Sequence, residues 1–268
     1  MANKFLMRID ELTKYFPEPP LTLAAALQRL LQPLYQFWTV FNFFLFMLAC
    51  LPFIVVPIIL HEKIGSWVAY RVFMKFWGFC FSALSGVFFR AKGRANLVPG
   101  QPYIFVVNHN SFFDSPALVH TIDQPFKALG KQEILGYPVF GFIFRYIGVT
   151  VDRNSLQSRK RSFDIIRKKV QAGFHIVIFP EGTMNDGSTL LNPFFDGAFR
   201  LAAATQVPIV PVAIHNSRYV LPRSWKLRPG TITVEFGQPL SPTLPAADLR
   251  QAAFDQIKAM LEQSTTHR

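Results

Sequence analysis

Residues 103–116 have the sequence YIFVVNHNSFFDSP, an apolar run that passes directly into a polar loop. The first five of these residues are aromatic or β-branched, which is typical of a buried β-strand. Pro116 lies in the first turn of the helix expected to follow, a position at which proline is favoured. The segment therefore predicts a strand, a short loop and a helix, the unit from which helix-covered parallel sheets are built.

The same alternation of strand and helix continues toward the C-terminus. We expect further strands at residues 148–151, 175–179, 209–214 and 231–236, and helices at 114–121, 155–172, 193–204 and 246–262. These elements predict the α/β fold class, with a largely parallel β-sheet flanked by helices. Ligands of such sheets bind at loops beyond the carboxyl ends of the strands, so the chemistry is expected there.

The N-terminal part of the chain is strongly apolar. Residues 37–60 contain no charge, and residues 66–89 carry only Arg71 and Lys75. Either stretch is long enough for a membrane-crossing helix, although Pro52 and Pro57 are expected to interrupt the first one. Three interpretations stay open: two crossing helices, a hairpin in one leaflet with the two charges at the head groups, and two core helices of a soluble protein.

This contrast divides the chain into two predicted parts. Residues 1–95 form an N-terminal membrane-associated helical segment with an apolar hairpin, and residues 96–268 form the α/β domain. The chain has 28 Lys and Arg against 16 Asp and Glu, a net charge of +12, and 50% hydrophobic residues. Two cysteines exclude a disulfide scaffold. Most aromatic residues lie apart from the basic ones, so nucleic acid is not an expected partner, whereas anionic lipid is.

The loop after residues 103–107 carries the first candidate site. His109 follows the strand and Asp114 comes five residues later. A carboxylate bonded to one imidazole nitrogen leaves the other nitrogen free to take a proton from a substrate hydroxyl. The alternative is that His109 caps a turn and Asp114 caps a helix. A metal site is a third interpretation, but further ligands are missing, so we expect no metal.

A second candidate site follows residues 175–179. Glu181, Gly182 and Thr183 come directly after this strand, where glycine permits close backbone approach and the polar side chains bind a polyol or orient a basic residue. An ordinary turn is the alternative interpretation. Further along, residues 207–212 read VPIVPV, and a strand with two prolines is expected at an edge or along a cleft.

Four blocks in this order resemble the 1-acylglycerol-3-phosphate (lysophosphatidic acid) acyltransferase family of glycerolipid acyltransferases. They are the HxxxxD pattern of residues 109–114, a block from Lys131 to Arg153, the FPEGT sequence of residues 179–183, and VPIVPV at residues 207–212. The resemblance covers about residues 101–239. Apolar helices ahead of the HxxxxD pattern are also usual in that family.

The resemblance implies transfer of a fatty acyl group from acyl-CoA or acyl carrier protein to the sn-2 hydroxyl of 1-acylglycerol-3-phosphate, which makes phosphatidic acid. It implies that His109 is the general base, that Asp114 is its partner and that no cofactor is required. The resemblance places Glu181, Gly182 and Thr183 in the acceptor site. It also implies that Lys131 and Arg153 face the acceptor phosphate.

One position departs from the family pattern. Many members read FPEGTR, but Met184 stands here in place of that arginine. Either Arg153, Lys131 or Arg200 supplies the missing charge, or the acceptor is another lyso-lipid. A non-catalytic basic membrane-binding protein is the alternative of a different class. The resemblance also implies a bacterial inner membrane location, with the active domain on the cytoplasmic side.

Overall fold

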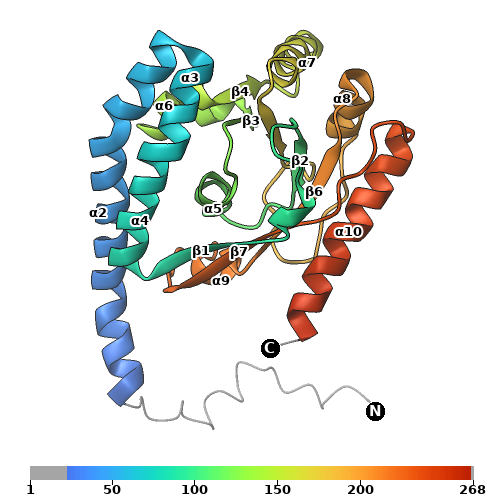
Figure 1. Cartoon of the computed structure of the whole chain (residues 1–268). Coiled ribbons are helices and arrows are strands. Elements are labelled where there is room, and N and C mark those ends of the chain that lie inside the picture. Colours follow the sequence, from blue (N-terminus) through green and yellow to red (C-terminus); the bar gives the residue numbers. More distant parts are fainter. Residues whose placement is uncertain (1–22, 267–268) are drawn as a thin grey trace, which may run out of the picture.

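The computed structural model describes residues 23–266, whose centre is a seven-stranded sheet (Figure 1). Its strands are β1 (Val87–Lys92), β2 (Ile104–Val107), β3 (Phe126–Lys131), β4 (Gly148–Val151), β5 (His175–Ile178), β6 (Ile209–His215) and β7 (Gly230–Phe236). The strand order is β1-β7-β6-β2-β5-β3-β4. All neighbours are parallel except β6 and β7. The predicted α/β class with a largely parallel sheet is therefore confirmed.

Helices cover both faces of this sheet (Figure 1). One side carries α5 (Asp114–Thr121), α6 (Phe140–Ile147) and an N-terminal hairpin, while the other carries α7 (Leu156–Gln171), α8 (Gly197–Thr205) and α10 (Ala246–Thr266). A short helix, α9 (Ser217–Val220), follows β6. The predicted helices at 114–121, 155–172, 193–204 and 246–262 correspond to α5, α7, α8 and α10.

Strand β2 lies in the middle of the sheet and is buried on both faces, which explains its unbroken apolar sequence. Phe105 and Val107 pack on the side of α5 and the hairpin. Ile104 and Val106 pack on the side of α7, α8 and α10. All four are fully buried, so β2 contributes side chains to the hydrophobic core on each face of the sheet.

The N-terminal hairpin consists of α2 (Leu23–Leu60) and a returning helix made of α3 (Glu62–Val68), a π-helical stretch (Ala69–Met74) and α4 (Lys75–Ser85). Pro33, Pro52 and Pro57 lie inside α2, so the expectation that prolines interrupt this run is wrong. Buried residues spaced three or four apart cross both later prolines and hold the helix together: Met47, Cys50, Ile54 and Ile58.

The opposite face of the hairpin is apolar and exposed. Phe37, Leu60 and Phe79 are 71%, 79% and 73% exposed. Within α2, Leu30–Leu60 is long and apolar enough to cross a membrane. Single exposed apolar residues are common on soluble proteins, but a contiguous face of this kind marks an interaction site. The hairpin is consistent with a membrane location.

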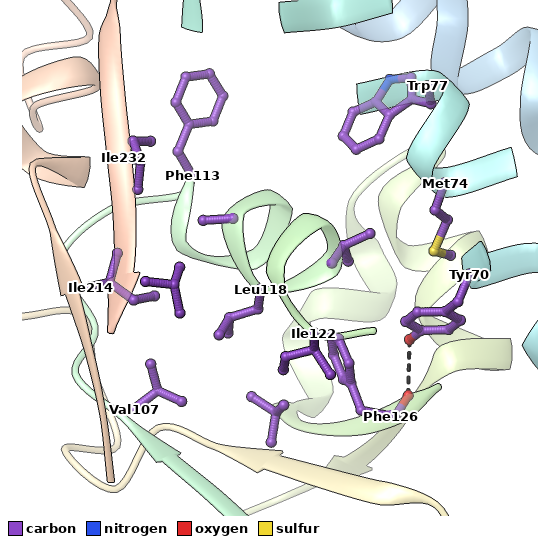
Figure 2. Packing of buried hydrophobic residues seen from close by; sticks show 14 of the residues in the cluster. Tyr70, Met74, Trp77, Val107, Phe113, Leu118, Ile122, Phe126, Ile214 and Ile232 are labelled. Carbon is purple, nitrogen blue, oxygen red and sulfur yellow. Dashed lines mark hydrogen bonds between the residues drawn. The ribbon is translucent and has the colours of Figure 1, made fainter. Parts of the chain in front are cut away.

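The inner face of the hairpin packs against the α/β part of the chain (Figure 2). The Tyr70 hydroxyl donates to the carbonyl oxygen of Phe126 at 2.9 Å. Lys75 Nζ donates to the carbonyl of His120 at 2.5 Å, and Arg71 Nη1 to that of Asp123 at 3.4 Å. The two cations in the second apolar stretch therefore contact the end of α5 and the residues just after it, and Arg71 is at the same time exposed.

Two strands were absent from the sequence-based prediction. β1 lies partly in the apolar stretch 66–89, where left-handed Gly86 (φ 68°) ends α4 and lets the chain pair with β7. β3 has the sequence FKALGK, which lacks β-branched residues, and it becomes a strand through pairing with β4 and β5. Because β1 precedes residue 96, the sheet starts inside the predicted N-terminal segment. The domain division at 95/96 stays a prediction.

Candidate active site

The candidate site lies where β2 and β5 end side by side. These two strands are parallel neighbours, so the loops that follow them meet at one edge of the sheet. Asn108 anchors the first loop, since its Oδ1 accepts from the Ile214 N–H at 2.7 Å and its Nδ2 donates to the Ile214 carbonyl at 3.2 Å. The end of β2 is thereby tied to β6.

His109 and Asp114 form a hydrogen-bonded pair. His109 Nδ1 lies 2.8 Å from Asp114 Oδ2, and the imidazole side chain is 21% exposed. The imidazole also stacks on Phe179, with ring centroids 4.2 Å apart. Within the described residues, Nε2 of His109 has no hydrogen-bond partner. The pair therefore has the geometry of a general base whose tautomer is set by a carboxylate.

Asp114 is fully buried and is held by its own loop. Its Oδ2 also accepts from the backbone N–H groups of Asn110, at 2.6 Å, and Ser111, at 2.8 Å. The carboxylate thus bonds to groups that precede α5, whereas a helix cap bonds to groups in the first turn. The helix-cap interpretation of Asp114 is wrong. The hydrogen bonds to Asn110 and Ser111 hold the Asp114 carboxylate against Nδ1 of His109.

Glu181 supports the same loop from the end of β5. Its Oε1 accepts from the His109 N–H at 2.7 Å, and its Oε2 accepts from the Asn192 N–H at 2.9 Å. Burial raises the pKa of the Glu181 carboxyl, although the hydrogen bonds partly oppose this effect. The carboxylate is 2% exposed, so its direct contacts orient the backbone beside the imidazole. A direct contact with an acceptor stays a prediction.

Gly182 and Arg153 are in contact. Gly182 is left-handed (φ 71°), and a Cβ here would meet the Arg153 guanidinium and the Phe195 ring. Arg153 Nη1 donates to the Gly182 carbonyl. This contact brings the cation at the end of β4 to the loop after β5. Thr183, the next residue, is exposed.

Lys131 lies at the same edge of the sheet but apart from these contacts. It is the last residue of β3 and pairs in register with Val151, two residues before Arg153. Its side chain is exposed and makes no hydrogen bond or ion pair within the described part of the chain. The structure thus joins His109, Asp114, Glu181, Gly182 and Arg153 through direct contacts, and it leaves Lys131 and Thr183 in solvent.

Three polar residues were missed by the sequence-based prediction. Asn185 donates its backbone N–H to the His109 carbonyl at 2.7 Å, and Arg218 Nη2 donates to Asn110 Oδ1 at 3.1 Å. Arg218 Nη2 also donates to the Asn185 carbonyl at 2.9 Å. Asn110 and Asn185 lie in the two loops already singled out. No sequence signal pointed to Arg218, which comes from α9.

The other histidines of the α/β part do not form a metal centre. Burial lowers the pKa of His175 to about 4, and its Nδ1 accepts from the Tyr103 N–H at 3.0 Å. Burial lowers the pKa of His120 to about 3. These are neutral core histidines. Residues 23–266 contain no group of three or more His, Cys, Asp or Glu side chains arranged to hold a metal ion.

Comparisons with known proteins agree with this architecture. Residues 88–215 match the family model described as Acyltransferase. The chain is 31% identical over 173 residues to a 1-acyl-sn-glycerol-3-phosphate acyltransferase of Chlamydomonas reinhardtii, which covers 63% of this chain and 52% of the relative. It is 29% identical over 159 residues to that of Escherichia coli (strain K12), covering 59% and 61%. The chain thus spans about half to three fifths of these relatives.

A solved structure supports the fold. The crystal structure of the 1-acyl-sn-glycerophosphate (LPA) acyltransferase PlsC from Thermotoga maritima superposes with a TM-score of 0.75 at 19% identity, covering 89% of this chain and 98% of that one. The human 1-acyl-sn-glycerol-3-phosphate acyltransferase beta is 31% identical over 173 residues, covering 63% of this chain and 62% of its own length. The resemblance inferred from the HxxxxD and FPEGT sequences is confirmed: residues 88–215 match the Acyltransferase family model, and 1-acyl-sn-glycerol-3-phosphate acyltransferases are among the proteins to which the chain is similar.

Proposed function

We propose that this protein transfers a fatty acyl group from acyl-CoA or acyl carrier protein to the sn-2 hydroxyl of 1-acylglycerol-3-phosphate, making phosphatidic acid. The observation that carries this proposal is the His109–Asp114 pair, 2.8 Å apart, with Nε2 of the imidazole left free. The names of the related proteins support the same acceptor. Acyl-CoA and acyl carrier protein both present a thioester, which is already activated for attack.

The proposed reaction uses His109 twice. Nε2 accepts the proton of the acceptor hydroxyl while that oxygen attacks the thioester carbonyl. The tetrahedral intermediate then expels the thiolate, and the imidazolium returns the proton to sulfur. Asp114 stays ionised and stabilises the imidazolium through the Nδ1 hydrogen bond. These reaction steps balance protons without a metal or cofactor, so we propose that the reaction requires neither.

A panel of acceptors tests the function. Purified full-length protein is mixed with palmitoyl-CoA and one acceptor, and release of the free CoA thiol is followed over time. The acceptors are 1-acylglycerol-3-phosphate, 1-acylglycerol and 1-acylglycerophosphocholine, with a chelator present in a parallel series. We expect kcat/KM for 1-acylglycerol-3-phosphate to exceed the other two values by at least about tenfold, a difference of about 1.4 kcal/mol. The chelator should change nothing.

The outcomes separate the reaction from its acceptor. Absence of thiol release with all three acceptors, and with palmitoyl-acyl carrier protein as donor, contradicts acyl transfer altogether. Thiol release that is fastest with 1-acylglycerophosphocholine keeps the acyl transfer and overturns the acceptor.

We further propose that the hairpin of α2, α3 and α4 holds the site at a membrane. Only its outer face is free for lipid, because α4 packs against α5 along its inner face. A hairpin crossing the bilayer would carry α5 into the hydrocarbon, so we infer that it lies against one leaflet. Since acyl-CoA and acyl carrier protein are cytosolic, we propose that the membrane is a bacterial inner membrane and that the site lies on its cytoplasmic side.

Charged substitutions on the exposed hairpin face test this attachment. The variant combines Phe37→Asp, Phe41→Asp and Leu48→Asp, all at exposed positions. Because each charge costs about 2.5–3.5 kcal/mol in hydrocarbon, we expect less than a tenth of the wild-type fraction to float with phosphatidylglycerol vesicles. Flotation is measured in a density gradient.

A matched control carries the same added charge elsewhere. It combines Val98→Asp, Leu156→Asp and Leu244→Asp, which are exposed apolar positions outside the hairpin. We expect this control to float like the wild type. Equal flotation of both variants would show that the exposed hairpin face does not attach the protein to the membrane. Deleting the hairpin is unsuitable as a test of membrane attachment, because Tyr70 and Phe81 belong to the hydrophobic core between the hairpin and the sheet.

A further inference from the structure

Met184 and Asn185 directly follow the FPEGT sequence, and two arginines from another part of the chain bond to their carbonyl groups. Arg223 Nη2 donates to the Met184 carbonyl at 3.0 Å. Arg218 Nη2 donates to the carbonyl of the next residue, Asn185, at 2.9 Å. We propose that Arg218 supplies the cation that binds the acceptor phosphate in this protein. The proposal rests on the proposed function and names a residue for its acceptor site.

The guanidinium of Arg218 is held in place by neutral oxygens. Nη2 donates to the side-chain Oδ1 of Asn110 at 3.1 Å, and to the Oδ1 of Asn185, also at 3.1 Å. No carboxylate forms an ion pair with Arg218 within residues 23–266. Amide oxygens orient a cation without neutralising it, so the full positive charge stays available to an anion.

Two nitrogens of this guanidinium make no hydrogen bond to the described residues. All of its hydrogen bonds to described residues use Nη2, and the side chain is half-buried. Nη1 lies against Gly187, whose left-handed backbone (φ 98°) leaves room that a Cβ would fill. Nη1 and Nε have no hydrogen-bond partner among these residues. Arginine binds phosphate through its charged N–H groups, and those of Nη1 and Nε are the ones left for a ligand here.

The position relative to His109 suits the acceptor. Asn110 is the next residue after His109, and Asn185 donates its N–H to the His109 carbonyl at 2.7 Å. Arg218 therefore contacts the residue that follows His109 and the residue that is hydrogen-bonded to the His109 carbonyl. In 1-acylglycerol-3-phosphate the reacting hydroxyl and the phosphate ester are on adjacent carbons. A cation bonded to the loop that carries the general base thus suits the short distance between these two groups.

The neighbouring cations differ from Arg218 in their surroundings. Arg223 lies near Asp186, where it adds to the lowering of that carboxyl's pKa, which hydrogen bonds from Ser188 mainly cause. Arg153 lies near the Glu133 carboxylate and donates to the Gly182 carbonyl. Each of these two cations therefore has an acidic neighbour that offsets its charge. Arg218 is the better-placed cation for a phosphate ligand.

Direct binding of the acceptor tests the proposal without requiring turnover. Full-length wild type and Arg218→Gln are titrated calorimetrically with 1-oleoylglycerol-3-phosphate and with 1-oleoylglycerol in detergent micelles, without an acyl donor. We expect Arg218→Gln to weaken binding of the phosphate-bearing acceptor by roughly tenfold to a hundredfold, as for loss of a charged hydrogen bond. Binding of 1-oleoylglycerol should change less than threefold.

Two further variants make the result specific. Arg228→Gln removes a half-buried arginine of the same segment, whose guanidinium lies over the Tyr219 ring, and we expect it to bind both ligands like the wild type. Arg218→Lys keeps the charge but lacks the planar guanidinium and its several N–H groups, so we expect an intermediate loss confined to the phosphate-bearing ligand. This variant decides the question if Arg218→Gln does not fold.

Three outcomes would overturn the proposal. Unchanged affinity of the Arg218 variants for 1-oleoylglycerol-3-phosphate would exclude phosphate binding. Equal losses for both ligands would show that Arg218 only clamps the two loops together. A wild type that binds both ligands equally would contradict a phosphate site. Failure of acyl transfer in the acceptor panel is a separate result, because binding is measured here without a donor.

Discussion

His109→Ala is expected to lower kcat by roughly 10²–10⁴-fold, the contribution of general base catalysis. Its Nε2 is the group proposed to take the hydroxyl proton, and within the described residues no other titratable group is bonded to Asp114. KM for the acceptor should change little, because the imidazole is proposed to act on one hydroxyl only. The measurement is steady-state thiol release from palmitoyl-CoA with 1-acylglycerol-3-phosphate.

His61→Ala is the matched control for this experiment. His61 is exposed in the turn between α2 and α3, where its ring accepts from the Ile64 N–H. We expect near-wild-type kcat from this variant. Thermal unfolding should show that His109→Ala stays folded, since the ring is partly exposed and, among the described residues, stacks only on Phe179. A kcat of His109→Ala within tenfold of the wild type would refute the role of this residue.

Asp114→Asn is expected to lower kcat by a similar factor, on the order of 10²–10⁴-fold. The backbone N–H groups of Asn110 and Ser111 both point at Oδ2, so an asparagine keeps these bonds only with its amide oxygen in that place. The imidazole then keeps an acceptor but loses the negative charge that stabilises its protonated form. Comparing kcat and KM with those of the wild type measures this loss.

Asp164→Asn serves as the charge-matched control for Asp114→Asn. Asp164 is an exposed residue of α7, 3.9 Å from Arg167, and we expect its replacement to leave kcat unchanged. Asp114→Asn should unfold at nearly the wild-type temperature, because its backbone hydrogen bonds are kept. A rate within threefold of the wild type would mean that Asp114 only orders the loop and contributes no charge to the reaction.

The sequence predicted those strands and helices whose own residues have a composition typical of the element. β2, β4, β5, β6 and β7 have β-branched or aromatic sequences between turn residues, and α5 and α7 begin at recognisable positions. β3 was missed because FKALGK resembles no strand in isolation, and β1 because it follows an apolar helix without a polar break. Both gain their strand conformation from hydrogen bonds to distant partners.

The hairpin illustrates the same limit for charged residues. One interpretation of the sequence, a hairpin in one leaflet, places Arg71 and Lys75 at the lipid head groups. In the structure they contact backbone oxygens at the end of α5, some fifty residues away along the chain. Hydrophobicity along the sequence identifies an apolar helix, but it does not distinguish the side that faces lipid from the side that faces protein.

Local sequence was enough to identify His109, Asp114, Glu181 and Gly182 and their positions after strands, because strand patterns and chain order place them at the ends of β2 and β5. The position of Arg218 beside the site depends on the sheet order, which sets β6 beside β2. This order brings Arg218 into contact with Asn110, which is 108 residues away along the chain. Such a contact forms when whole strands pair and pack. Propensity and periodicity describe neighbours along the chain, and they carry no information on which distant strands become neighbours in space.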